Sequence, residues 1–319
     1  MGISRLRRGI IGAAAVCLLA MFASPVMAAT AASAAPAVAG PHFRFKTFDV
    51  PNSVYTEVYG INDRGVLVGQ YIDTNGISHG FIALGRRIIS VDVTGVGSVG
   101  AGLSAINNFG TAVGTWADST GTYHSFIRSP SGVITTINDP NAGPWGTSAA
   151  GVNNLGEVTG LYLDSSSAQH GFLYRNGKFI TIDAPGYQNT DVWGINDFGV
   201  VDGLGFTVTP VFSQMPFTLS TKVPGATFRS FSAPGQPVYS GAINNFGVVV
   251  GHSNDTVFIG WEQNHWTLTT ISDPLADNTP ATGNFGGTAA AGINDFGTVV
   301  GIYFDSTGTG HGFIAYPTR

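Results

Sequence analysis

Short apolar runs of β-branched and aromatic residues alternate along the chain with turns rich in Gly, Asn, Asp and Pro. No long stretch shows the 3.6-residue period of an amphipathic helix, and Gly alone accounts for 45 of the 319 residues. Such a pattern is typical of short strands joined by tight turns. The sequence therefore predicts an all-β fold.

The same pattern of turn and strand occurs six times. Each copy contains Gly/Ala-Ile/Val-Asn-Asp/Asn-x-Gly, followed by a short apolar run and another Gly. The apolar residue before Asn recurs at steps of 45, 46, 43, 48 and 50 residues, a period that indicates stacked or radially arranged units. The six copies are Gly60–Gly65, Ala105–Gly110, Gly151–Gly156, Gly194–Gly199, Ala242–Gly247 and Gly292–Gly297.

The third copy shows one complete unit. We expect strands over Ser148–Val152, Glu157–Leu163, Gln169–Tyr174 and Lys178–Ile182, separated by turns that contain Asn, Asp or Gly. Four short antiparallel strands in a unit of this length correspond to one blade of a β-propeller. The small residue before each Ile or Val fits an innermost strand, because several backbones converge near the axis of a propeller.

The two ends of the repeat region complement each other. The last copy ends after its third strand, His311–Ile314, whereas Phe43–Pro51 matches the fourth-strand phrase Lys178–Pro185. An N-terminal strand that completes the last blade would close a ring and remove its exposed edges. From His42 to Pro317 there are 276 residues, or six units of 46. We predict a six-bladed β-propeller closed by the N-terminal strand; a β-helix is the alternative, although its coils are usually shorter than these repeats.

The start of the chain has the features of a secretory signal peptide. The basic segment Ser4–Arg8 precedes the apolar run Ile10–Phe22, and small residues permit cleavage after Ala28. The apolar run is shorter than the roughly 20 residues of a membrane span. We therefore predict a signal peptide over residues 1–28 and export to the periplasm or the extracellular space.

The exported chain is poor in charge and lacks cysteine. Residues 29–41 are predicted to be a flexible leader rich in Ala and Pro, followed by a single propeller domain over residues 42–317. The one cysteine, Cys17, lies in the signal peptide, so stability would come without disulfides. The chain has 14 basic and 19 acidic residues and no basic cluster that would favour nucleic acid or an anionic membrane. We expect no nucleic-acid partner, no cofactor, no membrane span after cleavage, and a monomer.

Four copies contain a His-x-Phe triplet downstream of the Asn turn. With these triplets the chain resembles a family of bacterial extracellular repeat proteins named for a His-Ala-Phe motif, the HAF repeats. Gly or Ser stands where the family has Ala. Copies four and five lack the triplet, so the sequence does not decide whether they form a third strand. The resemblance implies export and a repeat fold, with no established activity. The triplets are His79-Gly80-Phe81, His124-Ser125-Phe126, His170-Gly171-Phe172 and His311-Gly312-Phe313.

The repeated histidines and aspartates do not predict a metal site. In a ring, the four histidines would lie in different blades, too far apart to share an ion at about 2.0–2.1 Å. We expect each histidine to bond a turn of its own blade. The hairpin loops Asp73–Gly76, Asp118–Gly121 and Asp305–Gly308 resemble the Asp-boxes of sialidase propellers, but their spacing from Asp to Gly is longer. Asx-turns that close the hairpins account for them.

Residue types suited to catalysis are sparse. Glu57, Glu157 and Glu262 are the only glutamates, and nothing marks the pair of carboxylates, about 5–9.5 Å apart, that a glycosidase needs. No Gly-x-Ser-x-Gly phrase is present. The sequence favours a non-catalytic protein, and we assign no catalytic residue. A hydrolase or lyase acting on polysaccharide is one alternative, because propellers host such sites by loop variation; a structural matrix protein is another.

The loop-bearing end of the propeller is the predicted ligand site. The connections from fourth to first strand and from second to third strand emerge on this side, and loops on a rigid scaffold carry function. Aromatic rings mixed with carboxylates would suit a glycan or a peptide through stacking and hydrogen bonds. Tyr59 and Trp193, two residues before the repeated Ile, could instead wedge between blades. The predicted ligand-binding residues are Tyr59, Trp145, Tyr187, Trp193, Asp183 and Asp273.

Overall fold

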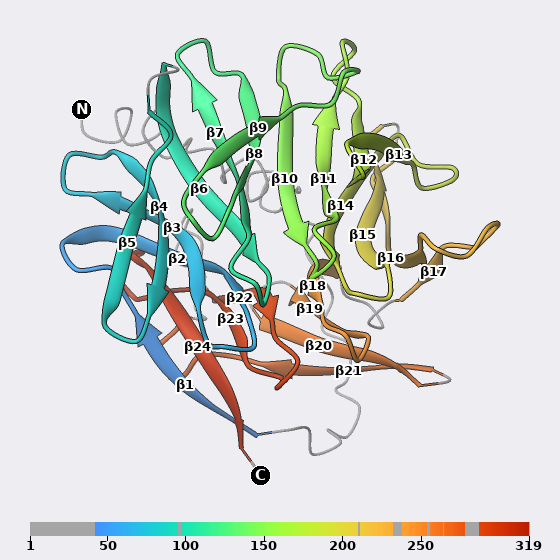
Figure 1. Cartoon of the computed structure of the whole chain (residues 1–319). Helices are drawn as coiled ribbons and strands as arrows, with labels where there is room; N and C mark the ends of the chain where they lie inside the picture. The colour runs from blue at the N-terminus through green and yellow to red at the C-terminus, as the bar shows by residue number, and fades with distance from the viewer. Residues whose placement is uncertain are drawn as a thin grey trace.

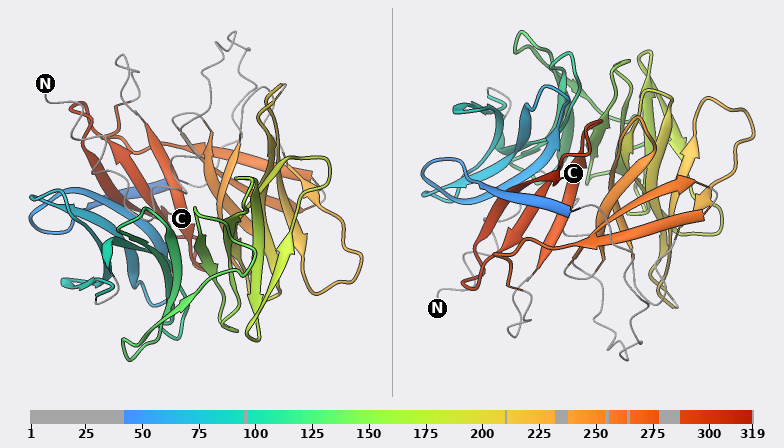
Figure 2. Two further views of the ribbon diagram at one scale, coloured as in Figure 1. Left: turned by 90° about the horizontal axis from the view of Figure 1, so that it is seen from above. Right: turned by 90° about the horizontal axis from the view of Figure 1, so that it is seen from below.

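Six antiparallel sheets of four strands each form the protein (Figure 1). The structure is a computed structural model that describes residues 42–94, 97–209, 211–231, 238–253, 256–263, 265–277 and 287–318. The predicted signal peptide and leader lie outside these residues. The sheets follow one another in chain order around a common axis (Figure 2), so the predicted six-bladed β-propeller is confirmed.

Each blade uses four strands in chain order from the axis outward, and the last blade takes its fourth strand from the N-terminus. Blade one consists of β2 (Ser53–Ile61), β3 (Leu67–Asp73), β4 (Ser78–Leu84) and β5 (Arg87–Val91). Blade two consists of β6 (Ser98–Ile106), β7 (Ala112–Asp118), β8 (Tyr123–Arg128) and β9 (Ile134–Ile137). Blade three consists of β10 (Thr147–Val152), β11 (Val158–Leu163), β12 (Gln169–Arg175) and β13 (Lys178–Ile182). Blade four consists of β14 (Asn189–Ile195), β15 (Val200–Thr207), β16 (Ser213–Ser220) and β17 (Arg229–Ser230). Blade five consists of β18 (Tyr239–Ile243), β19 (Val248–Ser253), β20 (Thr256–Gln263) and β21 (His265–Ile271). Blade six consists of β22 (Thr288–Ile293), β23 (Val299–Phe304), β24 (Gly310–Thr318) and β1 (His42–Phe48).

The N-terminal strand completes blade six. Strand β1 pairs antiparallel with β24 over seven residue pairs, and Phe45 lies opposite Ala315. The two strands, blue and red in Figure 1, lie side by side although they are at opposite ends of the described chain. The predicted closure is therefore present, and both chain ends contribute to one sheet.

The repeated Asn builds the turn between the first and second strand of each blade. In blade one, Oδ1 of Asn62 accepts hydrogen bonds from the backbone N–H groups of Arg64 and Val66, each at 3.0 Å. Gly65 follows with φ of 72°, a conformation that costs a glycine little. The same two bonds recur in the other five copies. Local turn chemistry thus explains the Asn and the Gly of the repeat.

The side-chain amide of the same Asn joins each blade to the next. Nδ2 of Asn62 donates to the backbone carbonyl of Asn107, and four further copies continue this pattern around the axis. The sixth amide, of Asn294, returns to the carbonyl of Asn62 at 3.2 Å. Because the last bond returns to the first residue, the six turns form a closed hydrogen-bonded ring.

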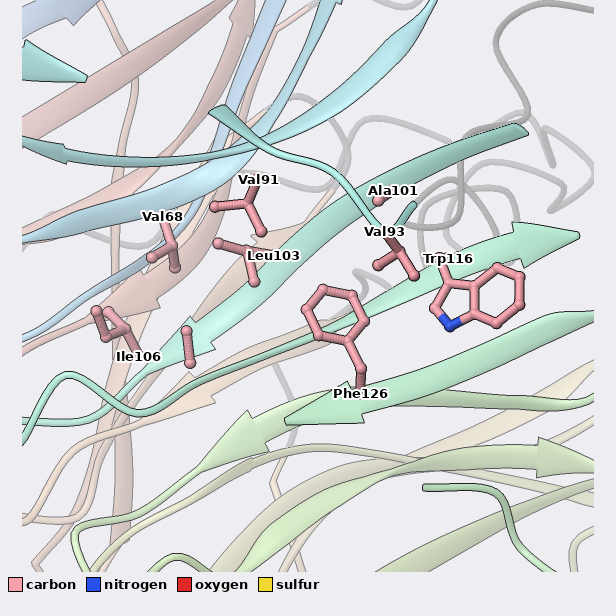
Figure 3. Close-up of a cluster of buried hydrophobic side chains, with 9 residues drawn as sticks. Val68, Val91, Val93, Ala101, Leu103, Ile106, Trp116 and Phe126 are labelled. Atoms are coloured by element: carbon pink, nitrogen blue, oxygen red, sulfur yellow. The ribbon is translucent and has the colours of Figure 1, made fainter. Parts of the chain in front are cut away.

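A fully buried phenylalanine on the third strand forms the core of each blade. Figure 3 shows Phe126 packed with Val68 and Leu103, so the core extends from blade two to blade one. The second-strand Gly makes room for the ring: a Cβ at Gly69 would lie 2.7 Å from the ring of Phe81. The six phenylalanines are Phe81, Phe126, Phe172, Phe217, Phe258 and Phe313.

Blades four and five have regular third strands without the His-x-Phe triplet. Phe217 on β16 and Phe258 on β20 occupy the buried position, and β20 pairs in register with both neighbours. The core therefore requires the phenylalanine and tolerates loss of the histidine. Within the described residues, no helix is long and apolar enough to cross a bilayer.

Candidate functional site

A ring of six aliphatic side chains divides the axial channel into two shallow cavities. Each cavity has a volume of about 80 Å³. Ligand pockets usually measure about 300 Å³ or more, so either cavity accepts only the terminal group of a ligand. The ring consists of the repeated residues Ile61, Ile106, Val152, Ile195, Ile243 and Ile293.

One of the two cavities, which we call the aromatic cavity, is lined by Tyr59 and Trp193 together with small residues. The two aromatic residues occupy corresponding positions in blades one and four, which stand opposite each other in a six-bladed ring. The other four blades have small residues at this position: Ser104, Ala150, Gly241 and Ala291. Blades one and four thus break the sixfold symmetry on the axis.

Glu57 is buried beside Tyr59 and accepts hydrogen bonds from two phenols. Its Oε2 accepts from the hydroxyl of Tyr55 at 2.7 Å and from that of Tyr59 at 2.8 Å. Only 1% of the residue is exposed, and burial raises the pKa of Glu57 to about 7 although both hydrogen bonds favour the charged form. Among the described residues, Oε1 has no hydrogen-bond partner. Glu57 is thus hydrogen-bonded to a cavity-lining phenol and keeps one buried acceptor oxygen, although it does not itself line the cavity.

Gln70 adds a second unused acceptor on the same blade. It lies on β3 directly opposite Glu57 on β2, so the two side chains share one face of the sheet. Gln70 is also buried, and its Oε1 lacks a hydrogen-bond partner within the described part of the chain. A buried acceptor without a partner is costly, and a ligand or a water molecule that donates a hydrogen bond would recover that cost.

Asp191 of blade four corresponds in position to Glu57. Each residue lies four positions before the repeated Ile, and Asp191 lies two positions before Trp193 on β14. The neighbouring Val192 points to blade three, where a Cβ at Gly171 would lie 2.4 Å from it. Since side chains alternate along a strand, Asp191 points away from blade three. Burial raises the pKa of Asp191 to about 7, and its Oδ1 has no partner among the residues the structure describes.

The predicted site residues fall into one pair and four separate places. Tyr59 and Trp193 line the same cavity. Trp145 is 54% exposed and borders a small separate cavity of about 20 Å³ with Tyr123 and Leu161. Tyr187 packs on the core of blade four, outside both axial cavities.

Of the two predicted aspartates, Asp183 contacts its own blade, and Asp273, in the connection after blade five, contacts the first strand of blade six. Asp183 is half-exposed and pairs with Nδ1 of His170 at 2.9 Å. Asp273 is buried: its Oδ1 accepts from the backbone N–H of Leu275, and its own N–H donates to Oγ1 of Thr288 at 3.0 Å. Burial raises the pKa of Asp273. Neither carboxylate lines the aromatic cavity.

The predicted ligand-binding residues do not include the buried acids Glu57 and Asp191. Both acids occupy the same position of the repeat, but the other four copies have no acid there, so the repeat pattern does not draw attention to them. An alignment of the six copies would have identified them. Only copies one and four combine an acid four residues before the repeated Ile or Val with an aromatic residue two before it. A residue that departs from the repeat in two opposite blades is better evidence for a site than a residue on a long loop.

The repeated histidines connect parts of their own blades, as expected. Nδ1 of His79 lies 2.7 Å from Asp92, after the fourth strand, and its Nε2 lies 3.7 Å from Asp73, in the hairpin loop. His170 and His311 make corresponding pairs, and His124 pairs with Asp118 and Asn138. Over the described ranges, no three His, Cys, Asp or Glu side chains are grouped so that they could hold a metal ion.

Comparison with known proteins yields similar folds at low identity. No protein-family model matches the chain, and no curated protein matches it. The fungal lectin of Aleuria aurantia, a six-bladed β-propeller solved with a fucose-containing disaccharide, is 13% identical with a TM-score of 0.48, covering 86% of this chain and 98% of the lectin.

Two similar solved structures are enzymes. Virginiamycin B lyase from Staphylococcus aureus is 11% identical with a TM-score of 0.44, covering 86% of this chain and 99% of the lyase. A gluconolactonase from Xanthomonas campestris is 12% identical with a TM-score of 0.47, covering 86% of this chain and 90% of the lactonase. Lectins and enzymes thus both occur among the similar propellers, at identities too low to carry a ligand or a reaction to this chain.

Proposed function

We propose that this protein is a secreted, non-catalytic β-propeller that binds an extracellular or cell-surface ligand, a glycan or a peptide, through the aromatic cavity on its axis. The observation that carries the proposal is the departure from sixfold symmetry in blades one and four. Each of these blades brings an aromatic ring and a buried carboxyl group to corresponding positions. A structural repeat has no need of such a departure, whereas a single site on a ring is made by residues that differ among the blades.

Buried polar atoms of blades one and four, which are not part of the cavity lining, would suit a ligand that donates hydrogen bonds and displaces the lining to reach them. Oε1 of Glu57, Oε1 of Gln70 and Oδ1 of Asp191 are acceptor oxygens, and each lacks a partner in the described portion of the protein. Tyr59 and Trp193 add apolar ring faces. Sugar hydroxyl and peptide N–H groups supply donors, and the carbon faces of a sugar stack on aromatic rings. The small cavity holds the end of such a ligand, and the remainder would lie outside it.

Export and membership of the HAF-repeat family are part of the same proposal. They rest on the basic and apolar start of the chain and on the four His-x-Phe triplets. An extracellular location would bring the aromatic cavity into contact with glycans and surface proteins. Detection of the protein in the cell-free or periplasmic fraction, with cleavage after Ala28 found by mass spectrometry, tests this part alone.

Binding of the mature chain to a glycan array and to a peptide array tests the ligand. We expect a bound ligand whose affinity falls at least about tenfold in Glu57→Leu and in Trp193→Ala, since the first change removes a carboxyl group and the second a stacking ring. Ile180→Ala is the matched control, because Ile180 lies exposed on β13, outside both axial cavities. Trp145→Ala shows whether the ligand extends to the loop before β10. Unchanged affinity in the Glu57 and Trp193 variants would reject the cavity as the binding site, whatever the effect of Trp145→Ala.

A polysaccharide-acting hydrolase or lyase is the second candidate. The observation that favours it is that burial raises the pKa of both Glu57 and Asp191 to about 7, where a carboxyl group can exchange protons during catalysis. Incubation of purified protein with a polysaccharide panel tests it. Release of reducing ends that disappears in Glu57→Gln and Asp191→Asn, with binding retained, would favour the enzyme over the binding protein.

A further inference from the structure

The end of the propeller that carries the Asn turns presents a circle of exposed apolar side chains. They occupy the variable position of Ile/Val-Asn-Asp/Asn-x-Gly, at the tip of each turn. Large apolar side chains are seldom this exposed in several neighbouring turns. The circle, which we call the apolar circle, consists of Phe109 (64% exposed), Leu155 (62%), Phe198 (66%), Phe246 (76%) and Phe296 (70%).

The fold does not require these side chains. The turn uses only the backbone N–H of the variable residue, which donates to Oδ1 of the preceding Asn, as in Phe109 to Asn107 at 3.0 Å. Blade one makes the same turn with Arg64 at this position. A polar residue would therefore serve the turn equally well and avoid exposed apolar surface. Exposed apolar side chains gathered at one end of a molecule mark a surface that another molecule covers.

An acidic mouth lies at the centre of the apolar circle. The residue after each repeated Asn lines the cavity on this side of the aliphatic ring, which also has a volume of about 80 Å³. Three of these residues are Asp63, Asp197 and Asp295, and the other three are asparagines. The basic groups nearby lie at the turns rather than in the mouth: Arg64 at one tip, and Lys222, whose Nζ donates to the backbone carbonyl of Asp197 at 2.8 Å.

The charge of the mouth selects among possible occupants. A second copy stacked end to end would bring two sets of three carboxylates together, which like-charge repulsion disfavours. An anionic membrane is disfavoured for the same reason. A lysine or arginine side chain would complement the carboxylates, and its head group suits a cavity of this size. Apolar neighbours of that side chain would cover the surrounding phenylalanines.

We infer that this end of the propeller docks a protein segment that places a lysine or arginine in the acidic mouth and apolar side chains on the apolar circle. The surface lies on the other side of the aliphatic ring from the aromatic cavity. A ligand in the aromatic cavity and a partner on the apolar circle would then be held by the same molecule at opposite ends of one rigid ring. This arrangement would make the propeller a connector between an extracellular ligand and a second protein.

Selection from a displayed library of random 12-residue peptides, with the mature protein as bait, tests the inference. We expect enriched peptides to combine at least one Lys or Arg with aromatic or aliphatic residues. A synthetic copy of the best peptide should bind about thirtyfold more weakly to Phe198→Ser/Phe246→Ser/Phe296→Ser, because exposed aromatic anchors dominate such interfaces. Its affinity should also fall with added salt, which screens the charge pair.

Two variants separate this surface from the aromatic cavity. Asp63→Asn/Asp295→Asn removes charge at carboxylates that also accept hydrogen bonds from neighbouring turns, and it should weaken the peptide while the Tm shows that the ring of turns is intact. Glu57→Gln should leave peptide binding unchanged. Enriched peptides without basic residues, or equal binding by the triple variant, would overturn the inference. So would dimers in analytical ultracentrifugation that the triple variant abolishes, or binding to neutral phosphatidylcholine vesicles that it abolishes.

Discussion

At the scale of single residues, three of the buried carboxyl groups in the described structure have a pKa raised to about 7. Glu57, Asp191 and Asp202 are each at most 1% exposed, and burial raises the pKa of each to about 7. Asp202 has partial compensation, since its Oδ1 accepts from the backbone N–H of Gly194 at 2.9 Å. The other four blades have uncharged residues at the position that Glu57 and Asp191 share, and the other five do at the position of Asp202, so these acids are a cost to folding.

The buried acids predict that stability falls as pH rises from about 4 to about 7. Their folded pKa values exceed the unfolded values near 4, so the folded protein binds more protons than the unfolded chain in this window. Each group therefore lowers the free energy of unfolding by up to about 1 kcal/mol per pH unit. Urea unfolding across this range checks the slope. Glu57→Gln should make the slope shallower, and an unchanged slope would show that Glu57 ionises as freely in the folded protein as in the unfolded chain.

Two phenylalanines of blade two allow the effect of a buried ring on stability to be compared with that of an exposed ring. Phe126 is fully buried in the core shared by blades one and two, whereas Phe109 is exposed at a turn tip. We expect Phe126→Ala to lower the free energy of unfolding by about 3–5 kcal/mol, because it leaves a cavity. Phe109→Ala should change it by less than about 0.5 kcal/mol. Thermal and urea unfolding measure both, and a large loss in Phe109→Ala would mean that the apolar circle stabilises the fold itself.

At the scale of elements, a histidine connects the N-terminal strand to blade six. Nδ1 of His311 on β24 lies 3.0 Å from Asp49, which follows β1, and its Nε2 lies 3.4 Å from Asp305 in the hairpin loop. In the other blades with this histidine, both partners belong to one continuous stretch of chain. In blade six, the same pair of contacts joins the two ends of the ring.

This contact predicts a pH-dependent contribution from His311. Burial opposes the charged imidazole, but hydrogen bonds and charge from Asp49 and Asp305 outweigh it, and the pKa of His311 is raised. The contribution is therefore complete below the unfolded pKa of about 6.5 and is lost as pH rises through the folded value. His311→Ala should cost more at pH 5.5 than at pH 8.5, values of about one unit or more on either side of that pKa. His311→Gln, which also lacks the titrating imidazole, should show the same difference by urea unfolding at both pH values, and equal losses at the two pH values for His311→Ala would contradict the assignment.

At the scale of the whole molecule, two sets of contacts close the ring of blades. The antiparallel pairing of β1 with β24 and the circle of six Asn amides both join the first repeat to the last. Each blade packs on two neighbours, so no blade has an open face. Rigid closure of this kind also brings residues from distant repeats together at the axis.

Removal of the closing strand should destabilise the entire ring. A chain that begins at Pro51 lacks β1 and exposes the edge of β24, so we expect its Tm to fall by at least about 10 °C relative to a chain that begins at His42. Differential scanning calorimetry of the two chains measures the change. Equal melting temperatures would contradict a structural role for the closure.

The architecture could be predicted from the sequence because its causes are local. Asn62 and Gly65 form their turn with neighbours within four residues, and the same phrase recurs six times. The N-terminal Phe43–Pro51 carries the fourth-strand pattern that the last copy lacks. Period, number of blades and closure all follow from such short-range patterns, since each blade repeats the same local geometry.

The site could be predicted only in part, because its residues meet through the ring. The loop-bearing end predicts Tyr59 and Trp193 as ligand-binding residues, and both line the aromatic cavity. The acids Glu57 and Asp191 belong to blades three apart, and their burial and missing hydrogen bonds depend on how neighbouring blades pack. The exposure of Phe198 was likewise decided by the tertiary structure. The sequence alone determined what each repeat becomes, whereas the closed ring decided which residues face the axis, the interior or the solvent.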